Sequence, residues 1–333
     1  METRRIDQAK PRPPASPGKR PGPLDVLRRH GAFAVLLLVV AGASFAFDGF
    51  LSPRNLENVL LQSAVLGLIV VGMTFVIVSG GIDLSVGSML ALGGVLAAVS
   101  VGVAWPLALV VPTAACGLIG LGQGLLIAKA KMAPFIVTLA GLLGIRGLAL
   151  VITDERPIGI DADTPFDWFG AGEVLGLPVP IWLMLAAFAA GGVVLARTPY
   201  GRTLFAIGGS EESARLMGLP VDRAKVTAYA VSGALAGFAG ALLAARLSAV
   251  QPNVGNALEL DAISAVVVGG TLLTGGAGSM GGSLAGVLLL GVLQNVINQV
   301  GTLGSYTQQL VSGVFLIVVV LIQAYLTRRR KAR

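Results

Sequence analysis

A series of long apolar runs, separated by short polar segments, is the feature that most constrains this chain. A helix needs about 20 mainly apolar residues to cross a bilayer, and ten candidate spans of roughly this kind recur between residues 31 and 326. They are residues 31–47, 58–79, 84–103, 105–128, 135–153, 179–196, 226–246, 261–274, 283–300 and 309–326. The first and the eighth are short, and the eighth is expected to be tilted, broken or extended into the glycine-rich turn that follows. The sequence predicts an all-α polytopic membrane protein with about ten transmembrane helices.

The composition agrees with this class and excludes several kinds of chemistry. The chain is 55% hydrophobic and only 12% charged, whereas a soluble domain carries about 25% charged residues. Its 46 glycines among 333 residues suit membrane helices, whose backbones approach closely at small residues. One cysteine, Cys116, and one histidine, His30, argue against an internal disulfide, most metal sites and histidine-dependent triads. We therefore expect neither a cofactor nor a metal, and no enzymatic activity.

Two glycine motifs bear on nucleotide binding. No G-x-x-x-x-G-K-[ST] motif occurs, so we expect ATP to be bound and hydrolysed, if at all, on another chain. The stretch GAGSMG, residues 276–281, matches G-x-G-x-x-G by spelling. It lies between two candidate spans without a βαβ context, so packing glycines at a helix turn are the better interpretation.

The basic residues are distributed as orientation signals and not as a nucleic-acid-binding groove. The chain has 24 Lys and Arg and a formal net charge of +7, clustered at the termini and in two loops. With ten spans and cytoplasmic ends, all but four of these cations fall inside, in line with the positive-inside rule. The exceptions are Arg54, Arg156 and Arg246, which fall outside, and Arg146, which lies in the fifth span. We predict cytoplasmic termini and no nucleic-acid partner.

The predicted organisation is one membrane domain with two tails. Residues 1–30 are rich in proline and cations and read as a disordered basic cytoplasmic tail. Residues 31–326 form the transmembrane domain in the lipid bilayer, and residues 327–333 form a second basic cytoplasmic tail. Two hydrophilic segments interrupt the spans: an irregular external loop at 154–178, with a possible short helix, and a cytoplasmic segment at 197–225.

The cytoplasmic segment contains a short helix of its own. Ser210 is a good N-cap, and Gly218 with Pro220 beyond it is a good C-terminal signal. The charged residues Glu211, Glu212 and Arg215 flank an apolar tip made of Leu216, Met217 and Leu219. The helix is either a solvated connector or, as its apolar tip favours, an amphipathic element that docks into a groove on a cytoplasmic partner.

Asp83 lies between two spans, where a charge is expensive. Gly80 and Gly81 are expected to end one helix, and Asp83 or Ser85 to cap the next, which satisfies free backbone N–H groups. The alternative is direct contact with a solute or a gate. The two are compatible, because discontinuous helices often border transport pathways.

Arg146 and a set of amides are the other polar groups within the spans. Arg146 lies near the middle of its span, so pairing with a carboxylate or a helix C-terminus is favoured over snorkelling, and a pathway role is the alternative. The amides serve either as interhelical hydrogen-bonding groups or as ligands of a neutral polyhydroxy solute. They are Gln62, Gln123, Gln294, Asn295, Asn298 and Gln299.

Taken together, these segments resemble the membrane subunit of ATP-binding cassette importers for monosaccharides, the ribose/xylose/galactose-type permeases. The resemblance extends from about residue 50 to residue 326. Its most specific parts are GGIDLSVGS, residues 80–88, and GG-x-EESARL-x-G-x-x-VDR-x-K, residues 208–225, in this order in one chain. It also covers residues 131–150 and 262–295. The chain departs from the family pattern at Ser210 and Gln123, where asparagine is common, and in its longer N-terminal tail.

The resemblance implies partners and roles. It implies a homodimeric permease in the bacterial cytoplasmic (inner) membrane, a separate ATP-binding cassette ATPase subunit and an extracytoplasmic sugar-binding protein. It implies coupling to the ATPase through Gly208, Gly209, Ser210, Glu211, Glu212, Arg215, Leu216, Met217 and Gly218. Residues expected at the translocation pathway or the broken helix are Gln62, Gly80, Gly81, Asp83, Ser85, Gln123, Arg146 and Asn295.

Three other functions compete with this one. A proton-coupled secondary carrier would use Asp83 and Arg146 as a relay, but it leaves the helix after Ser210 without a purpose. A permease for branched-chain amino acids is a near relative within the importer class, weakly disfavoured by the scarcity of charge in the spans. A membrane-embedded enzyme is the least favoured, because no cluster of nucleophile, base or metal ligands is visible.

Overall fold

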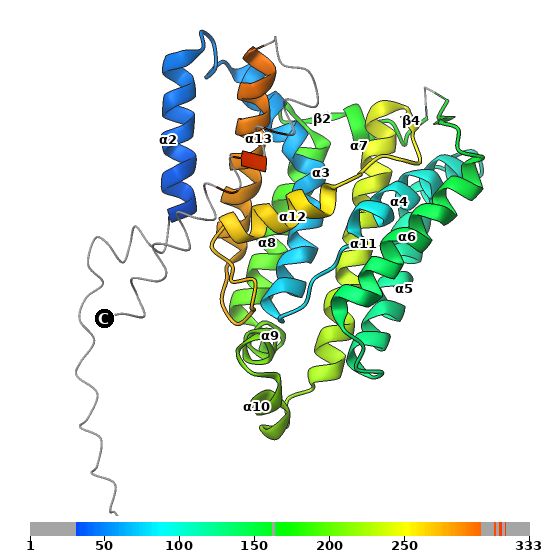
Figure 1. The fold of residues 1–333 in the computed structure, drawn as a ribbon. Helices are drawn as coiled ribbons and strands as arrows, with labels where there is room; N and C mark the ends of the chain where they lie inside the picture. The colour runs from blue at the N-terminus through cyan, green and yellow to red at the C-terminus, as the bar shows by residue number, and fades with distance from the viewer. Residues whose placement is uncertain (1–30, 162–163, 301–309, 311–312, 315–316, 318–333) are drawn as a thin grey trace, which may run out of the picture.

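The computed structural model describes residues 31–161, 164–300, 310, 313–314 and 317. Both predicted tails, and most of the candidate span at 309–326, lie outside these residues. The described part is dominated by helices (Figure 1). They are α2 (Gly31–Ala46), α3 (Pro53–Val78), α4 (Val86–Val101), α5 (Leu107–Ala128), α6 (Pro134–Thr153), α7 (Trp168–Ala171), α8 (Val179–Arg197), α9 (Pro199–Gly209), α10 (Glu211–Leu216), α11 (Val221–Leu247), α12 (Leu258–Val268) and α13 (Met280–Val300).

Six of the described helices are long and apolar enough to cross a membrane, namely α3, α5, α6, α8, α11 and α13. Two shorter apolar helices, α2 and α4, fall on the first and third candidate spans. The eighth candidate span, 261–274, is helical only to Val268, where the 11-residue α12 ends. At about 1.5 Å per residue, a helix of this length covers about half of a bilayer core. The expected break in this span is therefore present.

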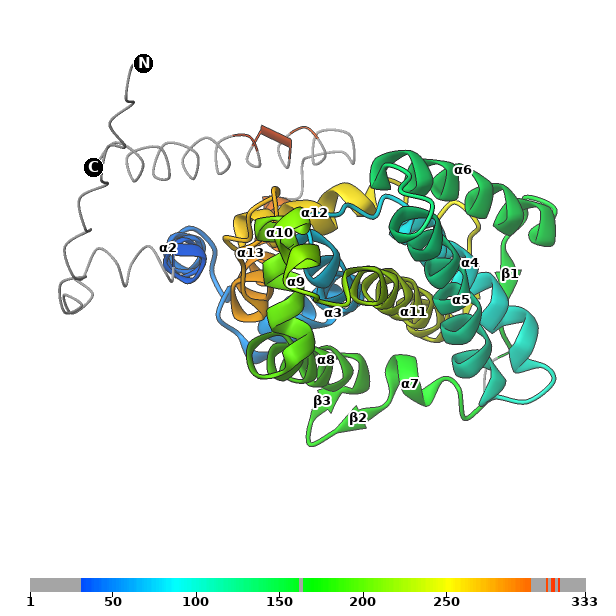
Figure 2. The same ribbon diagram turned by 90° about the horizontal axis from the view of Figure 1, so that it is seen from below.

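Helix α11 lies at the centre of the bundle, between α3 and the pair α4 and α5 (Figure 2). Its close approach to α4 depends on glycine, since a Cβ added to Gly93 would lie 2.7 Å from the Cα of Gly237. The largest fully buried side chain on α11 is Tyr229. Because small residues let membrane helices approach closely, the high glycine content of the sequence is used directly in this packing.

Two discontinuous segments interrupt the bundle. The chain at 79–85 leaves the end of α3 and crosses to α4, and the chain at 251–257 leads from β4 into α12, which runs across the bundle (Figure 1). After α12, residues 269–279 return along α3 to the level of α9, where α13 begins. Non-helical backbone at membrane depth is tolerated only where protein or a cavity surrounds it. Both segments are therefore candidate positions for a functional site.

The loop at 154–178 folds into short elements instead of remaining irregular throughout. It contains α7 and three two-residue strands, and the fourth strand lies after α11; they are β1 (Ile158–Gly159), β2 (Glu173–Val174), β3 (Leu177–Pro178) and β4 (Ala249–Val250). β1 pairs antiparallel with β4, with Ile158 opposite Val250, and β2 pairs antiparallel with β3. The first pairing ties this loop to the end of α11.

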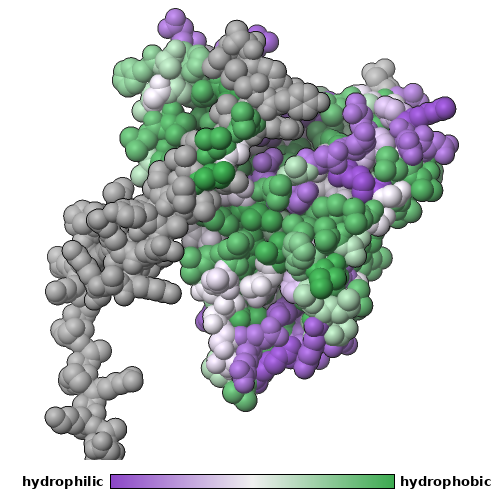
Figure 3. All heavy atoms as spheres, in the orientation of Figure 1, coloured by the Kyte–Doolittle hydropathy of each residue, from purple (hydrophilic) through white to green (hydrophobic). Residues whose placement is uncertain are grey.

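The surface divides into an apolar band and a polar end. Hydrophobic residues dominate the middle of the face in Figure 3, and hydrophilic residues gather at its lower end, where α9 and α10 lie. Exposed large apolar side chains on the long apolar helices include Leu118 of α5 and Leu143 of α6. An apolar band between polar ends is the surface expected of a protein that spans a bilayer.

Candidate functional site

Helix α10 begins at a capped turn at the polar end of the molecule. The hydroxyl of Ser210 accepts a hydrogen bond from the N–H of Ser213 at 3.2 Å, which is the N-cap predicted from the sequence. The helix ends at Leu216 with Met217 as its C-cap, and Gly218 follows with a φ of +76°, a conformation that favours glycine. The predicted short helix is thus confirmed, with Gly218 one residue beyond the C-cap.

Charged side chains attach α10 to the start of α11. Arg215 donates to Glu211 at 3.0 Å and to Asp222 at 2.6 Å, and Lys225 pairs with the other carboxylate oxygen of Glu211. Burial alone would raise the pKa of Glu211, but the hydrogen bonds from Lys225 and Arg215 outweigh it and hold the pKa below its ordinary value. Glu212, which the sequence grouped with these residues, is exposed and takes no part in the network.

Two of the three apolar residues predicted at the tip of α10, Leu216 and Met217, are uncovered, whereas Leu219 is partly buried against the core. Leu216 is 84% exposed and Met217 is 66% exposed, next to the ionic network. Helix α10 lies at the polar end of the molecule, beyond the apolar band (Figures 1 and 3). Large apolar side chains at such a polar end mark an interaction surface, because neither lipid nor the chain itself removes them from water.

Just before α10, three chain segments meet at glycines. The N–H of Gly276 donates to the carbonyl oxygen of Val78 at 3.0 Å, which joins the return segment after α12 to the end of α3. Gly208, in the last turn of α9, lies against both, since a Cβ added there would lie 2.0 Å from the same Val78 oxygen. Gly275 packs on Gly80 as closely, since a Cβ added to Gly275 would lie 2.8 Å from the Cα of Gly80. We call this contact of residues 78–80, 208–209 and 275–276 the glycine junction.

Asp83 is fully buried in the discontinuous segment and is held by three donors. One carboxylate oxygen accepts from the N–H and the hydroxyl of Ser85, at 3.0 and 2.6 Å. The other accepts from the hydroxyl of Ser232 on α11 at 2.8 Å. Gly80, with a φ of +79°, ends the turn after α3 as expected, and Ser85 is the residue before α4, although its side chain makes no capping bond. Asp83 thus connects the start of α4 to α11.

Gln123 and Tyr229 extend this network. The hydroxyl of Ser85 lies 3.2 Å from Gln123 Oε1, and the amide nitrogen of Gln123 is buried without a hydrogen-bond partner. A hydroxyl has a single hydrogen, so Ser85 cannot donate to both Asp83 and Gln123. Exchanging the amide oxygen and nitrogen of Gln123 would let it donate to Ser85 while Ser85 donates to Asp83. The hydroxyl of Tyr229 donates to the carbonyl of Ile82 at 3.2 Å and fixes the same segment.

Arg146 contacts backbone oxygens and makes no ion pair within the part of the chain that the structure describes. Its Nη1 donates to the carbonyls of Pro252 and Val254, at 2.8 and 2.6 Å. The preferred expectation of a carboxylate or a helix C-terminus as partner is therefore wrong. The segment 251–257 has no helix to satisfy its carbonyls, so the guanidinium takes that role.

Asn295 belongs to an amide cluster between α3 and α13. It exchanges hydrogen bonds with Asn55, at 2.9 and 3.2 Å, and Gln299 donates to both, at 3.1 and 3.2 Å. These are the interhelical bonds expected for amides within spans.

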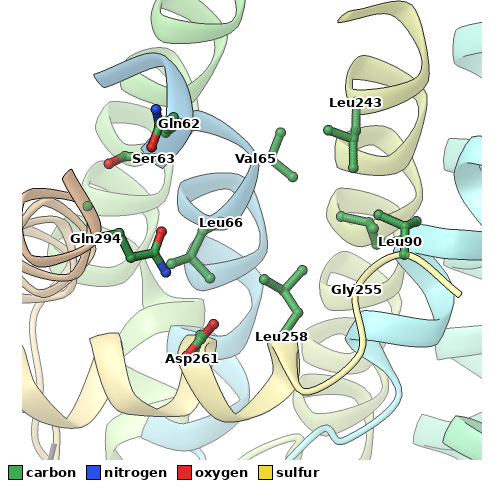
Figure 4. Close-up of a pocket in the computed structure, with 12 residues that line it drawn as sticks. Gln62, Ser63, Val65, Leu66, Leu90, Leu243, Gly255, Leu258, Asp261 and Gln294 are labelled. Carbon is green, nitrogen blue, oxygen red and sulfur yellow. The ribbon is translucent and has the colours of Figure 1, made fainter. Parts of the chain in front are cut away.

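A cavity of about 170 Å³ lies between α3, α12 and α13 (Figure 4). Of the predicted pathway residues, only Gln62 lines it. Asp83, Ser85, Gln123, Arg146 and Asn295 do not, nor do Gly80 and Gly81. Its other polar lining side chains are Ser63, Asp261 and Gln294. Gln294 was noted in the sequence only as a polar group within a span, and Asp261 was missed because it reads as part of the first turn of a helix. Among the described residues, no group of three His, Cys, Asp or Glu is arranged to hold a metal ion.

Comparison with known proteins gives one family. Residues 55–320 match the family described as branched-chain amino acid transport system / permease component. The chain is 46% identical over 300 residues to the ribose import permease protein RbsC of Bacillus subtilis (strain 168), covering 89% of this chain and 93% of that protein. It is 37% identical over 315 residues to the L-arabinose ABC transporter permease protein AraH of Azospirillum brasilense, covering 94% and 92%. It is 34% identical over 360 residues to the xylose transport system permease protein XylH of Escherichia coli (strain K12), covering 89% and 91%.

Proposed function

Because this chain belongs to the family of branched-chain amino acid transport system permease components, we propose that it forms the membrane pathway through which a monosaccharide enters the cell. It is the permease subunit of an ATP-binding cassette importer, and it is not an enzyme. Relatives named for ribose, arabinose and xylose import support a pentose or a similar polyol as its cargo. As a multi-pass protein, it belongs in the cytoplasmic (inner) membrane of a bacterium.

The exposed apolar tip of α10 is the observation that carries the proposed coupling to an ATPase. Leu216 and Met217 project from a helix that is capped by Ser210 and attached to α11 through Arg215. A rigid, short amphipathic helix with uncovered anchors fits a groove on a partner. We assign the partner as the ATPase subunit, and Gly208–Gly218 as the segment that contacts it.

The proposed topology has ten crossings and two cytoplasmic ends. The eighth crossing consists of α12 together with the non-helical segments before and after it, because this chain leads from β4, at the end of α11, to the glycine junction beside α9 (Figure 1). Residues 154–178 then lie outside, 197–225 lie inside, and 1–30 and 327–333 are cytoplasmic tails of the 31–326 membrane domain. A solute-binding protein delivers the sugar at the outer side.

A homodimer is the proposed assembly, with the pathway at its centre. Helix α12 crosses the face seen in Figure 1, and the cavity with Gln62 and Gln294 lies beside this helix (Figure 4). Polar side chains at membrane depth face a bundle interior or a water-filled cavity, not lipid. We therefore assign this face to the second copy of the chain.

The mechanism is a shift between two access states. ATP closes the ATPase domains, and the docked α10 moves with them. Through Asp222 and Lys225 the motion reaches α11, and through Gly208 it reaches the glycine junction. Both routes end at the segment that holds Asp83, so the break between α3 and α4 is the proposed moving part. The permease needs only to favour one of two arrangements at each stage of the ATP cycle.

Two alternative functions make different predictions. A proton-coupled carrier needs a titratable relay, but Arg146 is bound to backbone carbonyls and no described cation contacts Asp83. A branched-chain amino acid permease, the function in the family description, needs a counter-charge for the substrate carboxylate.

Uptake into proteoliposomes tests the proposal. The chain is reconstituted with its ATPase subunit and solute-binding protein, and uptake of labelled ribose, leucine and isoleucine is compared. We expect ribose uptake that requires ATP and persists with a protonophore. Uptake that collapses with the proton gradient would favour the carrier, and uptake of leucine in place of ribose would favour the amino acid permease.

A further inference from the structure

The cavity between α3, α12 and α13 brings together three polar side chains from three different helices. Gln62 of α3, Asp261 of α12 and Gln294 of α13 all line it. In Figure 4, the Asp261 carboxylate and the Gln294 amide both project into the space between these helices. These residues are at least 33 positions apart in the chain, so only the fold brings them together.

None of these three groups is used to hold the fold. Within residues 31–161 and 164–300, the amides of Gln62 and Gln294 and the carboxylate of Asp261 have no hydrogen-bond partner from the protein. The neighbouring amide of Asn295, by contrast, makes two bonds to Asn55. Polar groups without partners are costly at membrane depth unless they face water or a ligand. The cavity therefore has unused donors and acceptors.

Apart from Ser63, whose hydroxyl bonds to the carbonyl of Val59 in its own helix, the other side chains of the lining are apolar. Leu66 of α3, Leu243 of α11 and Leu258 of α12 form its walls. Ligand sites generally combine apolar walls with a few placed polar groups. A solute that must leave again needs binding that is neither absent nor tight, and three polar groups in a leucine-lined cavity meet both conditions.

The charge of the lining selects against a zwitterion. It contains one carboxyl group, Asp261, and no Lys, Arg or His. Arg146 donates to the carbonyls of Pro252 and Val254 and so holds the rim of the cavity, and Arg246 donates to the carbonyl of Leu61; neither side chain lines the cavity. A carboxyl oxygen accepts hydrogen bonds from hydroxyl groups, and each amide both donates and accepts. These are the groups that a neutral, hydroxyl-rich solute requires, whereas an amino acid carboxylate has no counter-charge here.

We propose that this cavity is a transient binding site for a neutral polyhydroxy solute within the membrane, with Asp261, Gln294 and Gln62 as its polar ligands. The proposal rests on the proposed function and adds to it the residues that contact the sugar. Arg146 is a positioning residue, because it acts through the loop at 251–257.

The test measures sugar moved per ATP hydrolysed. The full importer, with ATPase subunit and solute-binding protein, is reconstituted in proteoliposomes with labelled ribose as the probe. Asp261→Asn and Gln294→Leu are expected to lower maximal ribose uptake at least tenfold while ATP hydrolysis stays within about twofold of the wild type. The matched control is Gln299→Leu on the same helix as Gln294, because the Gln299 amide bonds to Asn55 and Asn295 and does not line the cavity. This control variant is expected to move as much ribose per ATP hydrolysed as the wild type.

If Asp261→Asn or Gln294→Leu fails to assemble into the importer, a second measurement tests the cavity site. Leu258→Cys, in a Cys116→Ala background, places one thiol in the cavity wall, and a water-soluble thiosulfonate reports its accessibility during turnover. Ribose is expected to slow labelling at least threefold, and an equal concentration of leucine is expected to have no effect.

The possible outcomes distinguish a failure of the proposed cavity site from a failure of the proposed transport function. The cavity site alone would be overturned if Asp261→Asn and Gln294→Leu took up ribose as fast as the wild type. It would also be overturned if ribose did not slow the labelling of Leu258→Cys. Absence of ATP-driven ribose uptake by the wild type would overturn the proposed function together with the site.

Discussion

The carbonyl oxygen of Val78, at the end of α3, accepts a hydrogen bond from the N–H of Gly276 at 3.0 Å, and Gly208 packs against both residues. This contact joins α3, the end of α9 and the chain that follows α12. Since α10 begins immediately after α9, we expect a displacement of α10 to reach the discontinuous segments of the membrane domain through these backbone contacts.

Gly208→Ala tests this contact. The added Cβ would lie 2.0 Å from the Val78 oxygen and 2.3 Å from the Gly276 nitrogen, so backbone must shift. We expect at least a tenfold loss of ATP-driven uptake, measured in proteoliposomes. Gly209→Ala is the control, because a Cβ there meets nothing within 4 Å. Equal activity of the two variants would contradict a transmitting role for the glycine junction.

Ser232→Ala removes one of the donors that hold Asp83. The second carboxylate oxygen then lacks its partner in a fully buried site, and an unsatisfied buried acceptor costs about 1–3 kcal/mol, more when charged. We expect a lower melting temperature in detergent. Ser44→Ala is the matched control, because Ser44 bonds only within its own helix, to Val40. A loss no greater than that of the control would refute a stabilising role for the Asp83–Ser232 bond.

Leu216→Ala and Met217→Ala test docking at the tip of α10. These exposed side chains are the apolar anchors available to the ATPase, and we expect each change to weaken ATPase binding about tenfold or more, which is ~1.4 kcal/mol. Leu118→Ala removes a similarly exposed side chain, 67% exposed on α5, and should leave binding unchanged. Affinity is measured by titrating labelled ATPase subunit onto the permease in nanodiscs. Equal affinities for all variants would place the docking surface elsewhere.

The ion pairs of α10 give a pH prediction. The pKa of Glu211 in the folded protein lies below its ordinary value, because hydrogen bonds from Lys225 and Arg215 outweigh its partial burial. Its contribution to stability is therefore complete above the unfolded-state pKa, about 4.3, and is lost as the pH falls through the lower folded value. A spin label at Ser213→Cys should stay immobile from pH 8 to pH 5 and become mobile only below about pH 4.

Glu211→Gln provides the comparison for this titration. Without the carboxylate, the label should be mobile across the whole pH range, whereas Glu212→Gln, at an exposed side chain outside the network, should behave as the wild type. Mobility in the wild type that changes between pH 5 and pH 8 would show that another group controls the orientation of α10.

Local signals in the sequence were sufficient for the membrane class, most spans and the capped α10. Apolar runs and the Ser210 cap depend on neighbours in the chain, so periodicity and spacing report them. The short eighth span was visible for the same reason, since its apolar run ends at a cluster of glycines. The family resemblance was likewise confirmed by the matched family and by relatives up to 46% identical.

Contacts between distant segments were not predictable in this way. The expected carboxylate or helix-end partner of Arg146 was wrong, because its carbonyl partners at 252 and 254 lie 106 and 108 residues away and carry no side-chain signal. The cavity brings Gln62 and Gln294 to one place only through the packing of α3 against α13. Asp261 appeared to be an ordinary residue in the first turn of α12. The roles of the pathway and coupling residues remain predictions for the experiments above.

Crosslinking of α10 to the ATPase subunit tests the central claim most directly. Ser213→Cys and Met217→Cys are introduced singly in a Cys116→Ala background and treated with a short thiol crosslinker, with and without ATP. Leu175→Cys, 89% exposed between β2 and β3, serves as the control at the opposite end of the molecule. The account predicts crosslinks to the ATPase subunit at both α10 positions, with yields that change with nucleotide, and none at position 175. No crosslink at either α10 position, together with sugar uptake that collapses with the proton gradient, would contradict it.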